Sequence, residues 1–277
     1  MSESDAKTHD AQPKAKPSSQ LQLLQLARNF VLDGALVAEE KQMPIDDRCI
    51  LRARNDAQRK QKNLEAIVHR AMHYCASSQS NAKPDVDWFS HFTSLAESIS
   101  NKTMQDLWAK ILAGETMKPG SFSYKALTTF RSLSIHDAKL IAKATALACK
   151  DSAEKSMRII TSCYKTPSFF SFLTGGSKSH PINLAQNGLN YTDLLNLMDN
   201  QLIFSQETET RPYKKGETLR FTYNGKQLNL VANVDNVVLQ YYKFTPIGAE
   251  LANLITDKPD EEFLAHLTTQ LSPCFSI

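Results

Sequence analysis

The 277-residue chain lacks the cysteine patterns of disulfide frameworks and thiolate zinc sites. Its five cysteines are scattered and never form a C-x-x-C pair; they are Cys49, Cys75, Cys149, Cys163 and Cys274. Small secreted domains pair an even number of cysteines, and structural zinc sites use closely spaced thiols. The cysteine pattern therefore argues against both classes and favours a reducing compartment.

Long apolar runs are also missing. No uninterrupted run approaches the roughly 18 residues that a membrane-spanning helix needs. Residues 1–19 are polar, contain Lys, Pro and Ser, and lack the apolar segment of a signal peptide. Such a composition cannot offset the entropy lost on ordering, so we expect a disordered tail. These features predict a cytoplasmic protein without membrane insertion.

A strong net charge is absent too, because 32 Lys and Arg face 29 Asp and Glu and leave a formal charge of +3. Nucleic-acid-binding domains gather basic residues on one face, so the position of the charges matters more than their sum. Residues 45–78 contain no Gly or Pro and predict one long helix. Its basic half offers candidate nucleic-acid contacts, although a solvated helix face explains the same residues. These candidates are Arg52, Arg59, Lys60 and Lys62.

Catalytic and cofactor motifs are not evident. Ser121 and Ser123 do not stand in a G-x-S-x-G sequence, and both suit the cap of a following helix. The segment 175–178, Gly-Gly-Ser-Lys, lacks the spaced first glycine and the preceding strand of a phosphate-binding loop. We therefore expect no cofactor, and an enzyme is the less favoured alternative.

Two places could still support an enzyme. Glu65, His69 and His73 follow one another at one helical turn, so they would project from one helix face as metal ligands do. No convincing fourth ligand accompanies them, and we predict no bound metal. Glu115 precedes a Pro-Gly turn and could act as a general base, which would need a second titratable group. Its position better suits a carboxylate that accepts hydrogen bonds from the next helix start.

Apolar residues recur at helical intervals through the first half of the chain. Trp88 and Phe92 mark one amphipathic helix, and Trp108 and Ile111 mark the next. Further helices are expected after Ser123 and up to about residue 150. We predict a helical domain over residues 20–165.

The last third of the chain predicts strands. Residues 219–231 alternate around Asn224-Gly225, which supplies both positive-φ positions of a two-residue hairpin turn. A helix is expected before this hairpin and another from Thr245-Pro246. This order predicts a winged-helix-like α/β unit over residues 189–277, and the whole chain is then expected to be mainly α. Basic residues near the hairpin would meet phosphates rather than bases. They are Lys214, Lys215 and Arg220.

Residues 166–188 are expected to be a linker or flap between the two domains. Phe169, Phe170 and Phe172 stand there beside Gly175-Gly176. Three large aromatic side chains in a loop could dock a protein partner, or could fill a small core beneath the loop.

Four sequence motifs carry a family resemblance. They are Arg59-Lys-Gln-Lys-Asn-Leu-Glu-Ala-Ile67, Asp87-Trp88-Phe89, Gln105-x-Leu-Trp-Ala-x-Ile-Leu-Ala-x-Glu115 and Pro119-Gly-Ser-Phe-Ser123. Together they resemble an uncharacterised bacterial family that contains a domain of unknown function. The resemblance covers residues 45–150 and, more loosely, residues 194–254, where Phe-Thr-Pro-Ile-Gly-Ala-Glu-Leu251 is similar to the closing helix of that family. It implies no established activity.

The leading hypothesis from the sequence is a non-enzymatic binding or regulatory module. It would engage a protein partner, and nucleic acid is a further possible partner. The alternative is an enzyme whose pocket assembles around Glu115 or around the helix face of Glu65, His69 and His73.

Overall fold

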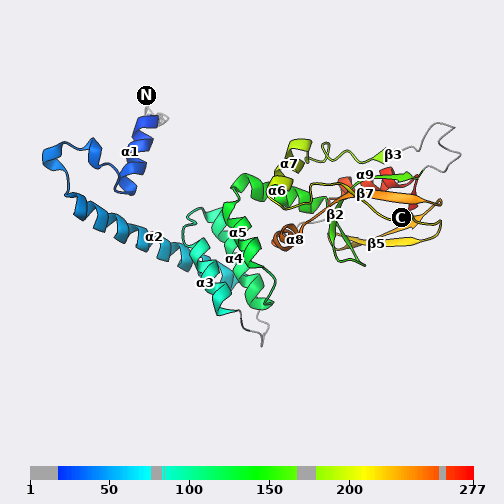
Figure 1. The fold of residues 1–277 in the computed structure, drawn as a ribbon, viewed down its shortest axis with the longest axis horizontal. Coiled ribbons are helices and arrows are strands. Elements are labelled where there is room, and N and C mark those ends of the chain that lie inside the picture. Colours follow the sequence, from blue (N-terminus) through cyan, green and yellow to red (C-terminus); the bar gives the residue numbers. More distant parts are fainter. Residues whose placement is uncertain (1–17, 76–82, 84, 167–178, 256–259) are drawn as a thin grey trace, which may run out of the picture. The chain divides into compact units, whose positions relative to one another are not determined.

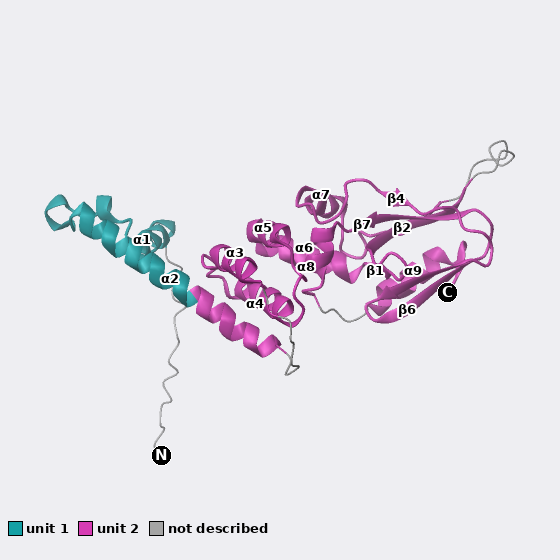
Figure 2. Ribbon diagram, turned by 60° about the horizontal axis from the view of Figure 1, so that its bottom comes forward, with its two compact units in different colours: residues 1–62 teal, residues 63–277 magenta. Residues whose placement is uncertain are grey.

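The computed structural model describes residues 18–75, 83, 85–166, 179–255 and 260–277 (Figure 1). The chain divides into two compact units, residues 1–62 and residues 63–277, here called unit 1 and unit 2 (Figure 2). The expected disordered tail, residues 1–19, lies outside the described residues except for its last two.

Unit 1 is helical. Helix α1 (Ser19–Asn29) begins at Ser18, whose side chain accepts a hydrogen bond from the backbone of Leu21. Two short 3₁₀ turns follow, η1 (Gly34–Leu36) and η2 (Glu39–Lys41). The long helix α2 (Ile45–Tyr74) then begins, and its residues after Lys62 belong to unit 2. The expected Gly- and Pro-free helix is therefore present.

Four more helices open unit 2. They are α3 (Val86–Ala96), α4 (Lys102–Met117), α5 (Tyr124–Ser132) and α6 (Ile135–Ala146). Each begins at a polar side chain that accepts a hydrogen bond from the first turn, as N-caps do. Ser134 and Asp137 form the capping box that starts α6.

An eight-stranded antiparallel sheet occupies the rest of unit 2, in the order β4-β7-β2-β1-β5-β6-β8, with β3 pairing on β2. The strands are β1 (Cys149–Asp151), β2 (Met157–Lys165), β3 (Ser179–Pro181), β4 (Thr208–Glu209), β5 (Thr218–Tyr223), β6 (Lys226–Ala232), β7 (Val237–Lys243) and β8 (Phe275–Ser276). Strand β2 pairs with β1 near its start and with β3 near its end.

Three helices accompany the sheet: α7 (Tyr191–Asp199), α8 (Pro246–Ala252) and α9 (Glu261–Leu271). Helix α9 contacts β2 and β3, and buries Phe263, Leu267 and Leu271 along one stripe. The Phe263 ring lies 5.8 Å from that of Tyr223 on β5, centroid to centroid. One continuous set of buried apolar residues joins the helices of unit 2 to its sheet.

The prediction of a mainly α fold is wrong. The described residues are 52% helical and 18% in strands, and the large antiparallel sheet makes this an α/β fold. Strands β1 and β2 fall inside the range 20–165, which was expected to be helical, and pair with β5 and β7 from the C-terminal range. Strand β2 is buried on both faces, so it lacks the alternation that reveals a strand.

The winged-helix expectation fails for a related reason. The hairpin itself is confirmed: β5 and β6 pair around Asn224 and Gly225, whose φ angles are 43° and 87°. This hairpin is not an isolated wing, because β5 pairs with β1 and β6 pairs with β8 on either side. It forms an interior part of the sheet.

Candidate functional site

The loop between α4 and α5, residues 119–123, is the point where the polar motif residues meet. Glu115 is only 3% exposed, and its carboxylate accepts backbone hydrogen bonds from Gly120 at 2.6 Å and Phe122 at 3.0 Å. From α3, Trp88 Nε1 donates to the carbonyl oxygen of Phe122 at 2.7 Å. Side chains of the second and third motifs, Trp88 and Glu115, thus fix the backbone of the fourth motif, residues 119–123.

Glu250 on α8, in the segment that resembles the closing helix of the family, contacts the same loop. One carboxylate oxygen of Glu250 accepts hydrogen bonds from the backbone nitrogen and the hydroxyl of Ser123, at 2.7 and 2.9 Å. The Ser123 oxygen in turn accepts from the nitrogen of Ala126 at 3.2 Å and caps α5. Residues 127 positions apart therefore cooperate in starting one helix.

A second buried polar group holds the turn between α3 and α4. Asn63 donates to the carbonyl of Glu97 at 2.9 Å and to the hydroxyl of Ser100 at 3.1 Å. Gln105 donates to the carbonyl of Ile99 at 2.9 Å and to the Asn63 side chain at 3.2 Å. Both amides are at most 7% exposed, so their pairing avoids the cost of burying unsatisfied polar groups.

The apolar motif residues form the core around these contacts. Trp108 is fully buried, and its ring lies 5.3 Å from both Phe92 and Phe130, centroid to centroid. Packed aromatic rings at this separation stabilise a core beyond their buried area. The motif residues described here therefore maintain the architecture of unit 2.

A family model described as a protein of unknown function (DUF2806) matches residues 47–268. The chain belongs to this family. The match begins in α2 and ends in α9, so it includes the helices of unit 2 up to residue 268 and every strand of its sheet except β8. No curated protein and no solved structure matches the chain.

Both carboxylates beside the Glu115 cavity are engaged with the backbone. This cavity of about 520 Å³ is also lined by Asp85. The Asp85 side chain caps α3 by accepting from the nitrogens of Asp87 and Trp88, at 2.7 and 3.1 Å. Asp85 and Glu115 thus each accept two backbone hydrogen bonds, which gives both carboxylates a structural role.

Glu65, His69 and His73 all lie on α2. The rings of His69 and His73 pack edge to face, with centroids 5.0 Å apart. Across the described ranges, no group of three or more His, Cys, Asp or Glu side chains could hold a metal ion. The geometry of this helix face gives no support to a metal-dependent enzyme.

Of the buried thiols, Cys149 and Cys163 are poorly suited to nucleophilic chemistry, whereas the pKa of Cys274 is lowered by its hydrogen bond with Cys163. Burial raises the pKa of Cys149 to about 12. The pKa of Cys163 is also raised, by a hydrogen bond with the Cys274 side chain and by burial. The thiolate is the reactive form, so thiols with raised pKa values stay inert near neutral pH.

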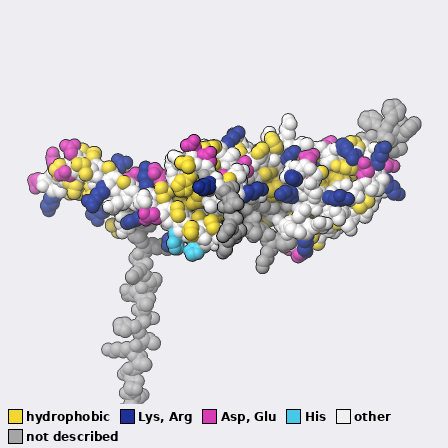
Figure 3. All heavy atoms as spheres, turned by 90° about the horizontal axis from the view of Figure 1, so that it is seen from below, with side chains coloured by type: hydrophobic (Ala, Val, Ile, Leu, Met, Phe, Trp, Pro, Cys, Tyr) yellow, Lys and Arg dark blue, Asp and Glu magenta, His cyan; other side chains and the backbone are white. Residues whose placement is uncertain are grey.

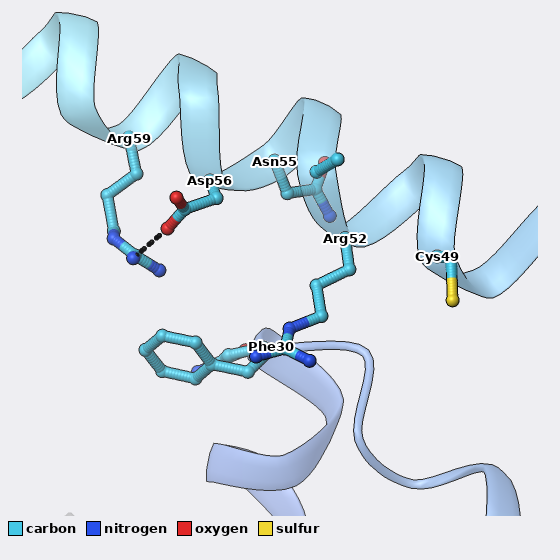
Figure 4. Close-up of a pocket in the computed structure, with 8 residues that line it drawn as sticks. Phe30, Cys49, Arg52, Asn55, Asp56 and Arg59 are labelled. Atoms are coloured by element: carbon cyan, nitrogen blue, oxygen red, sulfur yellow. Dashed lines mark hydrogen bonds and ion pairs between the residues drawn. The ribbon is translucent and has the colours of Figure 1, made fainter.

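Two basic residues of α2, Arg52 and Arg59, lie beside Phe30 at the end of α1. Arg52 and Arg59 line a hollow of about 470 Å³ beside Phe30, and the Arg59 guanidinium lies over the Phe30 ring at 4.8 Å (Figure 4). Asp56 pairs with both Arg59 and Lys60. Lys62 is exposed farther along the helix. Contact between these residues and nucleic acid stays a prediction.

The other nucleic-acid candidates lie in unit 2 around β5. The backbone nitrogens of Lys214 and Lys215 donate to the carboxylates of Glu217 and Asp235, at 2.7 and 2.9 Å, which fixes the loop before the strand. Arg220 is exposed on β5. The partner-binding candidates Phe169, Phe170 and Phe172 lie outside the described residues.

Two features were not singled out from the sequence. The first is the exposed apolar surface of unit 1, for which the sequence does hold a signal: leucines lie on more than one side of the helix over residues 19–29. The second is a cavity in unit 2 lined by Lys110, Lys118 and Lys150. No sequence signal could have found it, because these lysines come from a helix, a loop and a strand.

Proposed function

We propose that this protein is a non-enzymatic binding module that associates through unit 1, and that the surface it meets is unit 1 of a second copy. One observation carries the proposal. Of the described residues of unit 1, only Gly34 is buried, although the segment is rich in large apolar side chains. A helical segment of this size needs a buried core to be stable.

The apolar side chains of unit 1 lie at its surface instead, among acidic and basic groups (Figure 3). The exposed ones are Leu21, Leu23, Leu26, Phe30, Leu32, Leu36, Met43, Ile45 and Ile50. Single exposed apolar residues are ordinary, but a concentration of this kind marks a surface that another surface covers. About half of each side chain is already covered, so completing its burial would contribute roughly 1 kcal/mol or more.

The charges of α2 favour a second copy as the partner. Its first turn carries the exposed Asp46 and Asp47, whereas Arg54 and Lys62 lie two and four turns later. If two copies pack antiparallel about a two-fold axis, the acidic turn of each faces the basic turns of the other. Complementary charges of this kind select a partner and an orientation.

Sedimentation velocity of the full chain over a range of concentrations tests the proposal. We expect a monomer–dimer equilibrium. Leu23→Glu with Leu26→Glu should weaken it at least about 100-fold, because the dimer loses four leucines and each contributes about 1 kcal/mol when its burial is completed. Both side chains lie in unit 1, which contributes none of the buried hydrophobic residues, so the cooperative urea unfolding of unit 2 should stay unchanged.

The matched control places two glutamates on exposed apolar positions of unit 2. Val86→Glu and Tyr191→Glu replace side chains that are 81% and 70% exposed, each at the first position of a helix, where a carboxylate is favourable. This variant should dimerise like the natural chain. A chain that stays monomeric at all concentrations, or an equal effect of both variants, would contradict pairing through unit 1.

A further inference from the structure

The lysine-lined cavity of unit 2 has a volume of about 580 Å³. It is formed where the end of α2, the second half of α4, the loop before α5, the start of β1 and the end of α8 meet. Its side chains include Tyr74, Lys110, Lys118, Phe122, Lys150 and Leu254. Segments far apart in the sequence thus form one cavity, which no local sequence pattern predicts.

The cavity is positively charged. Three lysines line it, and none of its lining residues is Asp or Glu. Lys118 and Lys150 are exposed, and within the described part of the chain their ammonium groups have no ion pair or hydrogen bond. Lys110 lies 3.8 Å from Asp106 and 5.5 Å from the centroid of the Tyr74 ring. At least two cations are thus available to an anion.

The remaining lining combines apolar side chains with the polar Ser121 and Asn253. Phe122, Ala113 and Leu254 are at most 6% exposed, which gives the cavity a packed base. Tyr74 is 40% exposed, and its hydroxyl donates to Asp106 at 2.6 Å. This hydrogen bond holds the ring in one orientation, so that it offers a fixed aromatic surface next to the lysines.

We propose that this cavity binds a nucleoside phosphate. Lysine ammonium groups bind phosphate oxygens as compact point charges, and aromatic rings stack on nucleobases. The combination of free lysines with an exposed, fixed ring fits a ligand that has both an anionic and a flat apolar part. The ligand can be a free nucleotide or a nucleotide within a single strand. This site is independent of the association proposed for unit 1.

Isothermal titration calorimetry of the full chain with four probes tests the proposal. The probes are ATP, AMP, adenosine and inorganic phosphate. We expect affinity to fall from ATP to AMP and to be weakest for adenosine and phosphate, because only the nucleotides use both parts of the cavity. Affinity for ATP should also fall as salt rises, since cations carry the binding.

Lys118→Gln with Lys150→Gln should weaken ATP binding about 100-fold, about tenfold for each lost charge-assisted hydrogen bond. The matched control is Lys102→Gln with Lys139→Gln, which removes the same charge from exposed positions on α4 and α6 outside the cavity. The control should bind ATP within about twofold of the natural chain. Unchanged circular dichroism verifies that both variants fold.

Tyr74→Leu tests the aromatic part of the cavity separately from the lysines. It should weaken the binding of AMP while leaving the affinity for inorganic phosphate unchanged. A labelled single-stranded oligonucleotide distinguishes the sources: tighter binding than ATP, lost in the Lys118 and Lys150 variant, identifies a strand. No binding of either ATP or the oligonucleotide would overturn the proposal. So would equal losses in the cavity and control variants, or adenosine binding as tightly as ATP.

Discussion

At the scale of single residues, three buried polar side chains of unit 2 are satisfied by backbone groups of neighbouring turns. Asn63 and Gln105 hold the turn before α4, and Glu115 holds the loop after it. A buried donor or acceptor without a partner costs about 1–3 kcal/mol, so each of these residues is required once its turn is buried. These contacts give Asn63, Gln105 and Glu115 a structural role in the fold of unit 2.

Glu115→Ala should lower the free energy of unfolding by about 2–4 kcal/mol, because two buried or half-buried backbone N–H groups lose their acceptor. Urea denaturation measures the loss. Thr116→Ala is the control, since its hydroxyl only donates to the Leu112 carbonyl within the same helix, and should cost less than about 1 kcal/mol. A Glu115 variant as stable as the natural chain would show that the carboxylate is not a clamp.

The two tryptophans should respond differently to replacement by phenylalanine. Trp88→Phe removes the bond from Nε1 to the Phe122 carbonyl, whereas Trp108 Nε1 has no partner among the described residues. Both changes leave a similar small cavity, so the difference between them isolates the hydrogen bond. We expect Trp88→Phe to cost about 1 kcal/mol more in urea denaturation. The opposite order would contradict the assigned bond.

Glu217 should titrate abnormally. The side-chain hydrogen bonds from Arg211, at 3.0 and 3.1 Å, and the backbone nitrogen of Lys214 lower its pKa from the ordinary 4.5 to about 2. The stabilisation that this shift represents is complete above pH 4.5 and is lost as the pH falls toward 2. Carboxyl carbon NMR should show the low midpoint, and Arg211→Gln should move it upward. A native midpoint near the ordinary value would refute the pairing.

At the scale of elements, local chemistry made some parts predictable. Asn224-Gly225 specifies its turn by itself, and the prediction of a hairpin there is confirmed. The long helix and the caps at Ser123 and Ser134 follow equally local rules. Strands β1 and β2 were missed because β1 has three residues and β2 is buried on both faces. Their pairing with β5 and β7 depends on residues more than 60 positions away, which no local pattern encodes.

The same distinction applies to the candidate sites. Glu115 could be placed beside its turn because the partner nitrogens are within seven residues. Glu250, by contrast, hydrogen-bonds Ser123, which lies 127 residues earlier in the sequence. The three lysines of the lysine-lined cavity come from separate elements. Sequence spacing finds sites built from one helix or loop. Sites assembled by the tertiary fold require the structure.

The hairpin turn offers a test at this scale. Gly225 has a φ angle of 87°, and no atom lies within 4 Å of a Cβ placed there, so a substitution meets backbone strain and no steric clash. Gly225→Val should cost about 2 kcal/mol of unfolding free energy. Gln227→Val, an exposed position on β6 that favours β-branched residues, should cost nothing measurable. Equal stability of the two variants would argue against the left-handed turn.

At the scale of the whole molecule, the two units differ in what stabilises them. Every buried hydrophobic residue of the described chain lies at or beyond Ile67, inside unit 2. In the described part of unit 1, the local contacts include a capped helix, two short turns, surface ion pairs and the ring of Phe30 against Arg59. Unit 2 should therefore fold by itself, whereas unit 1 should depend on the surface that covers it.

Shortening the chain at either end tests this asymmetry. A chain of residues 57–277 keeps one and a half turns of α2 before Asn63, so the buried amide pair with Gln105 is retained. It should unfold cooperatively, with a urea midpoint close to that of the full chain, and sediment as a monomer. Isolated residues 1–56 should lack stable helix in circular dichroism, because short helices without a packed face are marginal in water.

Removing only residues 272–277 should do far more damage. This deletion takes away β8 and the side chain of Phe275, which is 1% exposed and packed in the core of unit 2. Emptying a large buried aromatic site costs about 3–5 kcal/mol, a large fraction of the total stability of a domain. Deleting residues 272–277 should thus lower the free energy of unfolding of unit 2 more than deleting residues 1–56. If the N-terminal deletion instead abolished cooperative unfolding, unit 1 would contribute directly to the core, and association through its exposed surface would lose its physical basis.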